Sequence, residues 1–242
     1  MLTRARKLAH LLQTPLYRNA LWKGVAAGVE HETILRRLDC NTVVDIGANR
    51  GQFALAVRRH LPQARIIAFE PLPEPARIFR AVFAGQSGVD LHEMAIGPSA
   101  GICTMHVSGR DDSSSLLPIT DLQAELHPGT GEVGLLQVRV EELGSIIREA
   151  DLIGPSLLKV DVQGSELECL EACGELLPHF DYLYVECGFQ EMYAGQAHAS
   201  RLIQFLFDRG FELSEICHVF HDAGGRTVDA DLLFSKGRRE QA

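Results

Sequence analysis

The chain has 242 residues, of which 46% are hydrophobic and 23% are charged. This balance excludes collagenous, coiled-coil and largely disordered chains, and the length is enough for one large α/β domain with its own core. The formal net charge of −9 argues against non-specific nucleic-acid binding, because proteins of that class carry a basic footprint. The sequence has no run of about 18 apolar residues, so no transmembrane segment is expected.

The first 37 residues differ from the rest of the chain in charge. Their net charge is +5, against −14 for the remaining residues. The basic start is interrupted by His10 and Pro15 before an apolar core can form, which argues against a signal peptide and favours a cytoplasmic protein. We predict that residues 1–37 form an N-terminal helical extension, packed on a domain of residues 38–242. Contact between this basic extension and an acidic membrane surface is the alternative.

From residue 41 onward, short apolar runs alternate with stretches of helical periodicity. This pattern is typical of a parallel sheet with helices on both faces. The predicted strands are 42–46, 65–69, 89–94, 102–107, 135–140, 157–162, 182–187, 211–216 and 231–235. The predicted helices are 51–61, 71–83, 140–150, 165–177 and 198–209. The sequence therefore predicts one doubly wound, mostly parallel, Rossmann-like α/β domain behind the N-terminal extension.

Three local signals accompany these elements. Residues 108–134 are rich in Ser, Gly, Asp and Pro, and a loop of this length inside a domain is usually functional or disordered. Ser165 and Glu168 match the S-x-x-E capping box at the start of a helix. The six cysteines form no C-x-x-C pair, so we expect reduced thiols, with Cys169 and Cys173 facing the core.

The segment from Asp45 to Gly51 joins the first strand of the sheet to the following helix. Its glycines allow a sharp turn and a close approach to a ligand beyond the strand end. The spacing is G-x-x-x-G, which differs from the G-x-G-x-x-G fingerprint of dinucleotide-binding domains. Asp45 suits a pyrophosphate poorly but favours the ammonium and sulfonium groups of S-adenosylmethionine. Glu70 closes the second strand, where an acid can accept hydrogen bonds from both ribose hydroxyls.

These segments resemble the FkbM-type S-adenosylmethionine-dependent methyltransferases. The matching stretches are VVDIGANRGQF, AFEP, the AIG after the third strand, DDSSSL, LLKVDVQGSELECL, YVE and DLLF, over roughly residues 41–236. The resemblance implies a class I methyltransferase sheet with S-adenosylmethionine as the cofactor. It also implies a set of cofactor-binding residues: Asp45, Gly47, Asn49 and Gly51 at the methionine part, Glu70 at the ribose, Met94 and Ala95 at the adenine, and Asp161 beside the methyl group. Many members have Glu where this chain has Gln163.

Methyl transfer from a sulfonium requires that the acceptor oxygen lie in line with the S–CH₃ bond, and a base or metal assists by removing the proton. Asp161 and Glu186 each close a central strand, so we predict that both are catalytic. The alternatives are a helix cap for Asp161 and an ion pair for Glu186. Ser114, Ser115 and His218 are predicted to contact the acceptor. A dense acid cluster is missing, so no metal ligand is assigned and a need for a divalent metal stays open.

The sequence thus predicts transfer of a methyl group from S-adenosylmethionine to a hydroxyl oxygen of a small-molecule, sugar or lipid- or polyketide-linked acceptor. Two alternatives are kept. One is a non-catalytic binding or scaffold protein with a methyltransferase-like fold, which loss of Asp45, Glu70 or Asp161 would have indicated. The other is a nicotinamide-dependent oxidoreductase, and Asp45 and the glycine spacing count against it.

Overall fold

The computed structural model describes residues 4–237; residues 1–3 and 238–242, at the ends of the two predicted regions, lie outside it. The strands are β1 (Thr42–Ile46), β2 (Arg65–Phe69), β3 (Val89–His92), β4 (Ala95–Ile96), β5 (Gly101–Ser108), β6 (Glu132–Glu141), β7 (Ser156–Val160), β8 (Tyr182–Gly188), β9 (Phe211–His221) and β10 (Thr227–Lys236). The α-helices are α1 (Arg4–Gln13), α2 (Pro15–Leu21), α3 (Glu32–Leu35), α4 (Gln52–His60), α5 (Pro73–Val82), α6 (Asp121–Leu126), α7 (Leu143–Ile146), α8 (Glu166–Ala172) and α9 (Ala199–Phe207). Short 3₁₀ turns are η1 (Val29–His31), η2 (Asp111–Ser113), η3 (Glu149–Asp151) and η4 (Gly174–His179).

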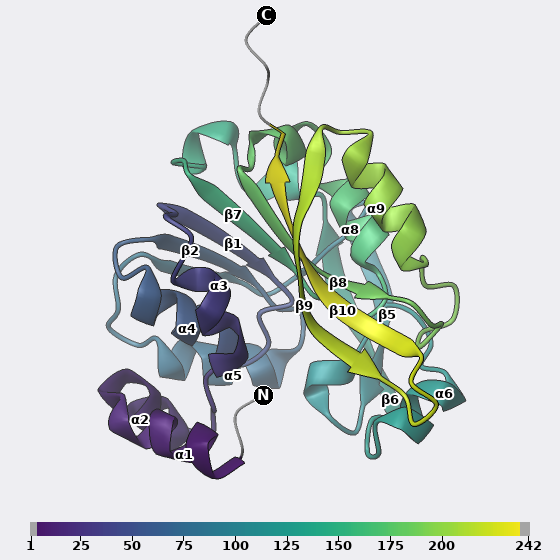
Figure 1. Ribbon diagram of the computed structural model, residues 1–242, viewed down its shortest axis with the longest axis horizontal. Helices are drawn as coiled ribbons and strands as arrows, with labels where there is room; N and C mark the ends of the chain where they lie inside the picture. The colour runs from purple at the N-terminus through teal and green to yellow at the C-terminus, as the bar shows by residue number, and fades with distance from the viewer. Residues whose placement is uncertain (1–3, 238–242) are drawn as a thin grey trace, which may run out of the picture.

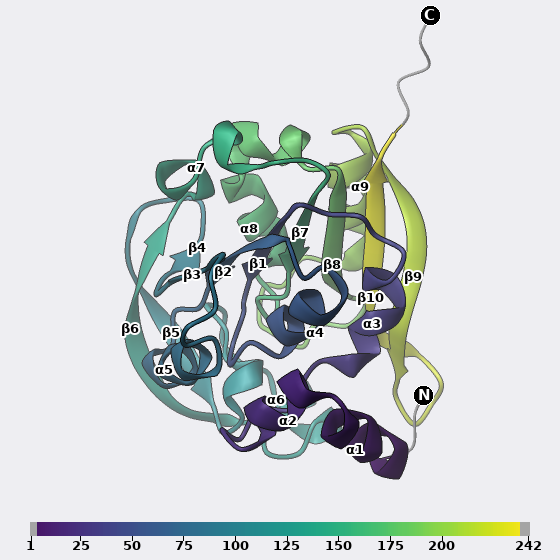
Figure 2. The same ribbon diagram turned by 90° about the vertical axis from the view of Figure 1, so that its left-hand side faces the viewer.

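The main sheet has seven strands in the order β3-β2-β1-β7-β8-β10-β9. The five strands from β3 to β8 run parallel. β10 lies between β8 and β9 and is antiparallel to both, as Figure 1 shows. Helices cover both faces of this sheet (Figures 1 and 2). The predicted doubly wound, mostly parallel fold is confirmed.

Side chains of the central strands alternate between two hydrophobic cores, one on each face of the sheet. Val44 and Leu158 belong to the core that α8 and α9 cover. Val43 and Leu157 belong to the other core, which α4, α5 and the N-terminal extension cover. Because successive residues of a strand face opposite ways, Asp45 lies on the same side as the N-terminal extension.

A second, three-stranded sheet has the order β4-β6-β5. The predicted strands 102–107 and 135–140 pair here as β5 and β6, antiparallel and outside the main sheet. The predicted helix 140–150 is wrong. Alternating burial continues along β6 to Val140, and the next four-residue helix, α7, is followed by extended backbone at Ile147. Leu143 and Ile147 are buried in the core and Ile146 packs against it, so the segment is held there without a longer helix.

The predicted capping box at Ser165 is wrong. Ser165 precedes α8, but its hydroxyl makes no hydrogen bond with the described residues. The carboxylate of Glu166, the first residue of α8, instead accepts hydrogen bonds from N–H groups of the preceding loop, including that of Gly164 at 3.0 Å. The helix also ends earlier than predicted, since Gly174, with φ at +52°, begins the turn η4.

The N-terminal extension packs on the face of the sheet that carries α4 (Figure 2). Tyr17 of α2 is fully buried there, and its hydroxyl donates to Glu32 at 2.7 Å. Glu32 also accepts hydrogen bonds from His10 (2.8 Å) and Arg36 (2.7 Å). Arg37 pairs with Glu215 on β9, so the extension is tied to both the sheet and its own helices. None of the helices in residues 4–237 is long and apolar enough to cross a membrane.

The long stretch 108–134 is ordered by two short helical segments and by contacts at its ends. η2 holds the turn after β5, and Thr120 caps the start of α6, because its hydroxyl accepts a hydrogen bond from the Gln123 N–H at 3.3 Å. An isolated bridge joins Ile119 to Tyr193. This segment therefore has a fixed position beside the carboxyl ends of the central strands.

Candidate functional site

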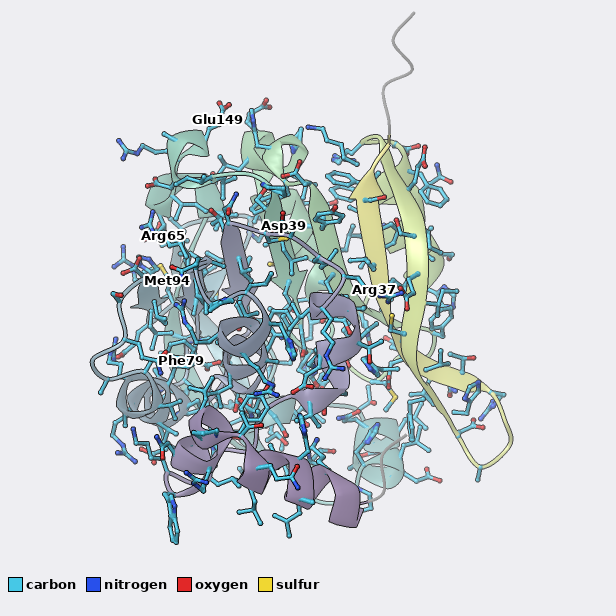
Figure 3. All side chains as sticks on the ribbon, turned by 60° about the vertical axis from the view of Figure 1, so that its left-hand side comes forward. Arg37, Asp39, Arg65, Phe79, Met94 and Glu149 are labelled. Carbon is cyan, nitrogen blue, oxygen red and sulfur yellow. The ribbon has the colours of Figure 1, made fainter. Side chains whose placement is uncertain are left out.

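A cavity of about 780 Å³ opens at the carboxyl ends of β1, β2 and β7. The strand order reverses between β1 and β7, which is the place where open α/β sheets bind ligands. The volume is in the range of small-molecule and cofactor sites. Seven of the predicted site residues line the wall: Gly47, Asn49, Glu70, Met94, Ala95, Ser114 and Asp161. Figure 3 shows Met94 at the β3 side of the molecule, far from Arg37 at the β9 side.

The turn from β1 to α4 depends on two glycines with left-handed backbone. Gly47 has φ at +82°, and a Cβ added there would collide with the carbonyl oxygen of Asp161. Gly51 has φ at +91° and lies against Phe79 and Phe83 of the α5 segment, so it serves the start of the helix and does not line the cavity. The turn of β1 thereby touches the end of β7, which fixes one wall of the cavity.

Glu70 follows β2 and presents its carboxylate to the cavity. One oxygen accepts the Asn49 N–H at 2.8 Å and the other accepts the Leu72 N–H at 2.7 Å. Burial raises the pKa of Glu70 to about 7, although these two backbone donors oppose the rise. The carboxyl group is thus held rigidly by the backbone, with lone pairs left for a ligand.

Lys159 lies between two of the predicted acids. Its Nζ is 3.6 Å from Asp45 Oδ1 and 3.1 Å from Asp161 Oδ2. Burial acts to lower the pKa of Lys159, but Asp161 and Asp45 outweigh it and hold the pKa above its usual range. Asp45 is fully buried and does not line the cavity, so it meets the site only through Lys159. Lys159 is a site residue that the sequence analysis missed; the signal that could have found it is a charged residue inside an otherwise apolar strand.

Asp161 and Glu186 are brought together by Gln163. The amide nitrogen of Gln163 donates to Asp161 Oδ1 and to Glu186 Oε2, both at 2.8 Å. The Tyr193 hydroxyl donates to the amide oxygen of Gln163 at 2.6 Å. A glutamate in place of Gln163 would offer no N–H group to bridge the two carboxylates.

The two predicted catalytic acids differ in their electrostatic surroundings. Burial raises the pKa of Glu186 well above its ordinary value, and Asp161 adds to the rise. Burial acts in the same direction on Asp161, but Lys159 and the Gln163 amide lower its pKa below the usual value. Asp161 lines the cavity and Glu186 does not, so Glu186 meets the site through the Gln163 side chain.

The three residues predicted to contact the acceptor are placed differently. Ser114 lines the cavity, and its hydroxyl accepts the Ser108 N–H at 3.0 Å. Ser115 is fully buried and does not line the cavity. Its hydroxyl accepts a hydrogen bond from the Leu117 N–H within a local turn. His218 lies outside the wall, on β9.

Two contributions to the cavity were missed at the sequence level. The N-terminal extension supplies part of the wall, where Lys7 and Glu30 form an ion pair at 2.8 Å. Arg50, after the β1 turn, donates two hydrogen bonds to Asp111 of η2, at 2.8 and 2.6 Å, and both residues line the cavity. These contacts join segments far apart in sequence, and neither has a local motif that signals it.

Comparison with known proteins places these features in a family. The model of the Methyltransferase FkbM domain matches residues 45–213. Methyltransferase 1 of Beauveria bassiana is 29% identical over 164 residues, which are 60% of this chain and 62% of that protein. The 2-O-methyltransferase NoeI of Sinorhizobium fredii is 27% identical over 184 residues, covering 70% of this chain and 76% of NoeI. The chain therefore spans less than two thirds of the first relative.

Solved structures share the fold at low sequence identity. Sp1610 of Streptococcus pneumoniae, solved in complex with S-adenosyl-L-methionine, has a TM-score of 0.50 at 11% identity over 88% of this chain and 75% of that chain. A protein of the NADB-Rossmann superfamily from Streptococcus agalactiae has a TM-score of 0.50 at 12% identity, over 90% of this chain and 72% of that one. The family match covers well over half of the chain, including the β1 turn, Glu70 and Asp161. The chain belongs to the FkbM methyltransferase domain family.

Proposed function

We propose that this protein transfers the methyl group of S-adenosylmethionine to a hydroxyl oxygen of a small-molecule, sugar or lipid- or polyketide-linked acceptor. The observation that carries the proposal is the cavity at the strand reversal, whose wall combines Glu70, Met94 and Asp161. The cofactor bound to Sp1610 supports the choice of methyl donor. The name of NoeI, a 2-O-methyltransferase, supports oxygen as the acceptor atom.

The cofactor is assigned to the β1 and β2 side of the cavity. Glu70 would accept hydrogen bonds from the ribose hydroxyls, because its carboxylate is fixed by backbone donors and faces the cavity. Met94 and Ala95 would flank the adenine, and Gly47 would let the methionine part approach the backbone. Asp161 supplies negative charge for the ammonium and sulfonium groups.

The transfer itself is a displacement in which the acceptor oxygen attacks the methyl carbon and the sulfur leaves with the bonding electrons. The protein's task is to align the oxygen and to take its proton. We assign proton removal to Asp161, because it lines the cavity and its two oxygens are fixed by Lys159 and Gln163. Glu186 is assigned to positioning Asp161 through Gln163.

The cofactor assignment is tested by calorimetry with S-adenosylmethionine, S-adenosylhomocysteine and NAD. We expect the first two to bind in the micromolar range and NAD to give no heat. Binding of NAD alone would favour the oxidoreductase alternative. No heat with any of the three would favour the non-catalytic scaffold.

The chemical assignment is tested with Asp161→Asn and a panel of hydroxyl acceptors, using S-adenosylmethionine labelled in the methyl group. Turnover should fall by about 10²-fold or more, while the affinity for S-adenosylhomocysteine should fall much less, because only the contact with its ammonium group is weakened. Asp229→Asn is the control, because Asp229 lies nearby on β10 but does not line the cavity. Unchanged turnover in Asp161→Asn would contradict the assignment of the base.

For a lipid-linked acceptor, we propose that the N-terminal extension contacts the membrane surface. Leu8, Leu12 and Trp22 are exposed there, Trp22 to 86%, and the extension is basic overall. The protein should float with vesicles of anionic lipid and remain behind with neutral ones. If anionic vesicles leave the protein behind as well, the extension serves only to pack against the domain.

A further inference from the structure

Four polar side chains from distant parts of the chain meet behind the cavity. They are His31 of η1, Tyr184 of β8, His218 of β9 and Asp231 of β10. The Tyr184 hydroxyl is 3.0 Å from His31 Nδ1, 3.1 Å from His218 Nδ1 and 2.9 Å from Asp231 Oδ2. His218 Nδ1 is 2.9 Å, and His31 Nδ1 is 3.9 Å, from Asp231 Oδ2. None of these four residues has a role in the proposed methyl transfer.

We propose that His31, His218 and Asp231 form a binding site for a divalent first-row transition-metal ion of the Zn²⁺ class. Two imidazoles and one carboxylate are a usual ligand set for such ions, whereas Mg²⁺ and Ca²⁺ prefer oxygen ligands alone. Ligand atoms of a tetrahedral zinc site lie about 3.3 Å apart, given bonds of about 2.0–2.1 Å. One atom from each of the three residues lies within 4.8 Å of the others, so small side-chain rotations bring them to that spacing.

The backbone at His218 is shaped to deliver its imidazole to this cluster. His218 lies in β9 with φ at +43°, a conformation that residues other than glycine adopt rarely. The pairing of β9 with β10 shifts register here, because Phe220 is opposite Asp229 while Cys217 is opposite Asp231. The extra residue on β9 is a bulge, a device that redirects a side chain. Regular pairing between β9 and β10 is thus interrupted at His218, the residue that supplies a ligand.

His31 is also held in a fixed orientation. Its ring meets Phe53 edge-on at 5.3 Å between centroids and Tyr184 at 5.6 Å. A Cβ added at Gly28 would lie 2.8 Å from the His31 ring, so the chain leaves no room for another side chain at position 28. A ligand fixed by packing before the metal arrives loses less entropy on binding.

The three ligands come from the two ends of the chain, outside the residues that the family model matches. The family match covers residues 45–213, which include Tyr184 but exclude His31, His218 and Asp231. A bound ion would therefore link the N-terminal extension to the β9–β10 hairpin. Because His31 also lines the cavity, this link would hold that part of the cavity wall in place.

The same distances also fit a hydrogen-bond chain without a metal. In that arrangement His31 donates to the Tyr184 hydroxyl, and Tyr184 and His218 both donate to Asp231. The two arrangements differ in one measurable respect. A hydrogen-bond chain gives the protein no response to added zinc, whereas a metal site raises the melting temperature as zinc is added.

The test uses the full-length protein after treatment with a chelator. Zn²⁺ is titrated by calorimetry and Co²⁺ by visible absorption, and the melting temperature is measured with and without Zn²⁺. We expect one ion per chain, the visible bands of four- or five-coordinate Co²⁺, and a higher melting temperature with Zn²⁺. His31→Ala and His218→Ala should each weaken binding at least about tenfold and abolish the thermal shift.

Two control variants and one conservative variant complete the test. His221→Ala removes another histidine of β9, exposed and outside the cluster, and Cys103→Ser removes an exposed thiol; both should leave zinc binding unchanged. Asp231→Asn keeps the size of the side chain and should weaken binding even if a histidine variant fails to fold. An unchanged zinc affinity in His31→Ala and His218→Ala, or a complete lack of Zn²⁺ and Co²⁺ binding to the unmodified protein, would overturn the proposal.

Discussion

At the scale of single residues, Glu70 gives the cavity a pH dependence near neutrality. Burial raises its pKa to about 7, so the carboxyl is half protonated there, and only the ionised form accepts hydrogen bonds from both ribose hydroxyls. Affinity for S-adenosylhomocysteine should therefore rise from pH 6 to pH 8. Glu70→Gln should bind more weakly, by about 1–3 kcal/mol, and show a flat profile, as measured by calorimetry.

A matched control for Glu70 is Glu74→Gln, because Glu74 is exposed and pairs with Arg77 on the surface of α5. This variant should keep both the affinity and the pH profile of the original protein. A rise in affinity with pH that persists in Glu70→Gln would assign the titration to another group.

Gly47 is the second residue whose local geometry makes a sharp prediction. Gly47→Ala adds a Cβ that collides with backbone and forces alanine to a positive φ, so the free energy of unfolding should fall by at least about 3 kcal/mol. Gly225→Ala is the control, since its φ is +80° but no atom lies near the added Cβ. It should cost only about 1 kcal/mol in urea denaturation. Equal losses in the two variants would show that the contact with Asp161 is unimportant.

Some site residues could be predicted from sequence and others could not, for a physical reason. Glu70 and Asp161 directly follow apolar strands. Parallel strands end at the same edge of a sheet, so the sequence alone predicts that both residues lie at the cavity beside that edge. The surroundings of Lys159 and His31 depend on which face of the sheet the N-terminal extension packs against. That choice is made by packing between segments far apart in sequence, and no local pattern records it.

At the scale of elements, the ion pair between Arg50 and Asp111 joins the α4 segment to η2 across the cavity. Arg50→Ala should release η2 and increase the dissociation rate of S-adenosylhomocysteine several-fold, measured by stopped-flow fluorescence or surface plasmon resonance. Asp111→Asn should have the same effect, and the double variant should add little to either single one.

Arg77→Ala is the control for this pair, because Arg77 also forms an ion pair, with Glu74 of α5, but is exposed and does not line the cavity. It should leave the dissociation rate unchanged. Additive effects of Arg50→Ala and Asp111→Asn would mean that each residue contacts the cofactor separately, and the two would not act as a bridge.

Strands were easier to predict than helices in this chain because of their burial. The central strands of the main sheet are buried on both faces, and a continuous apolar run is a strong signal. The segment after Val140 has only two buried apolar residues, Leu143 and Ile147, and their spacing of four fits a short helix and a turn as well as a long helix. The capping box at α8 is a wrong prediction because the Ser165 hydroxyl caps no helical N–H, while Glu166 bonds N–H groups of the loop before the helix.

At the scale of the whole molecule, Glu32 connects the N-terminal extension to α4. Burial alone would raise its pKa, but hydrogen bonds from His10 and Tyr17 and the nearby His60 lower it to about 2. The folded-state pKa is below the unfolded value, so this stabilisation is present above about pH 5 and is lost as the pH falls towards 2. Glu32→Gln should therefore lower the free energy of unfolding by about 2–3 kcal/mol at pH 7.

Urea denaturation at pH 7 and pH 4 checks this prediction. Protonation of Glu32 in the unfolded chain should reduce the difference between the two proteins by about 1 kcal/mol at pH 4. Glu171→Gln is the control, because Glu171 is exposed on α8 and lies outside the extension, so it should change the free energy of unfolding little at either pH. A difference that stays the same at both pH values would assign the effect to lost hydrogen bonding alone.

The position of β10 has a consequence for the order in which the molecule can assemble. β10 follows β9 along the chain, yet it lies between β8 and β9 in the sheet. During synthesis, β9 leaves the ribosome before the strand that connects it to the rest of the sheet. Until β10 inserts, β8 presents an unpaired edge, a site where a nascent chain is prone to aggregate. β10 therefore joins the sheet between two strands that precede it in the chain, and rapid pairing of the β9–β10 hairpin would shorten the time for which the edge of β8 is exposed.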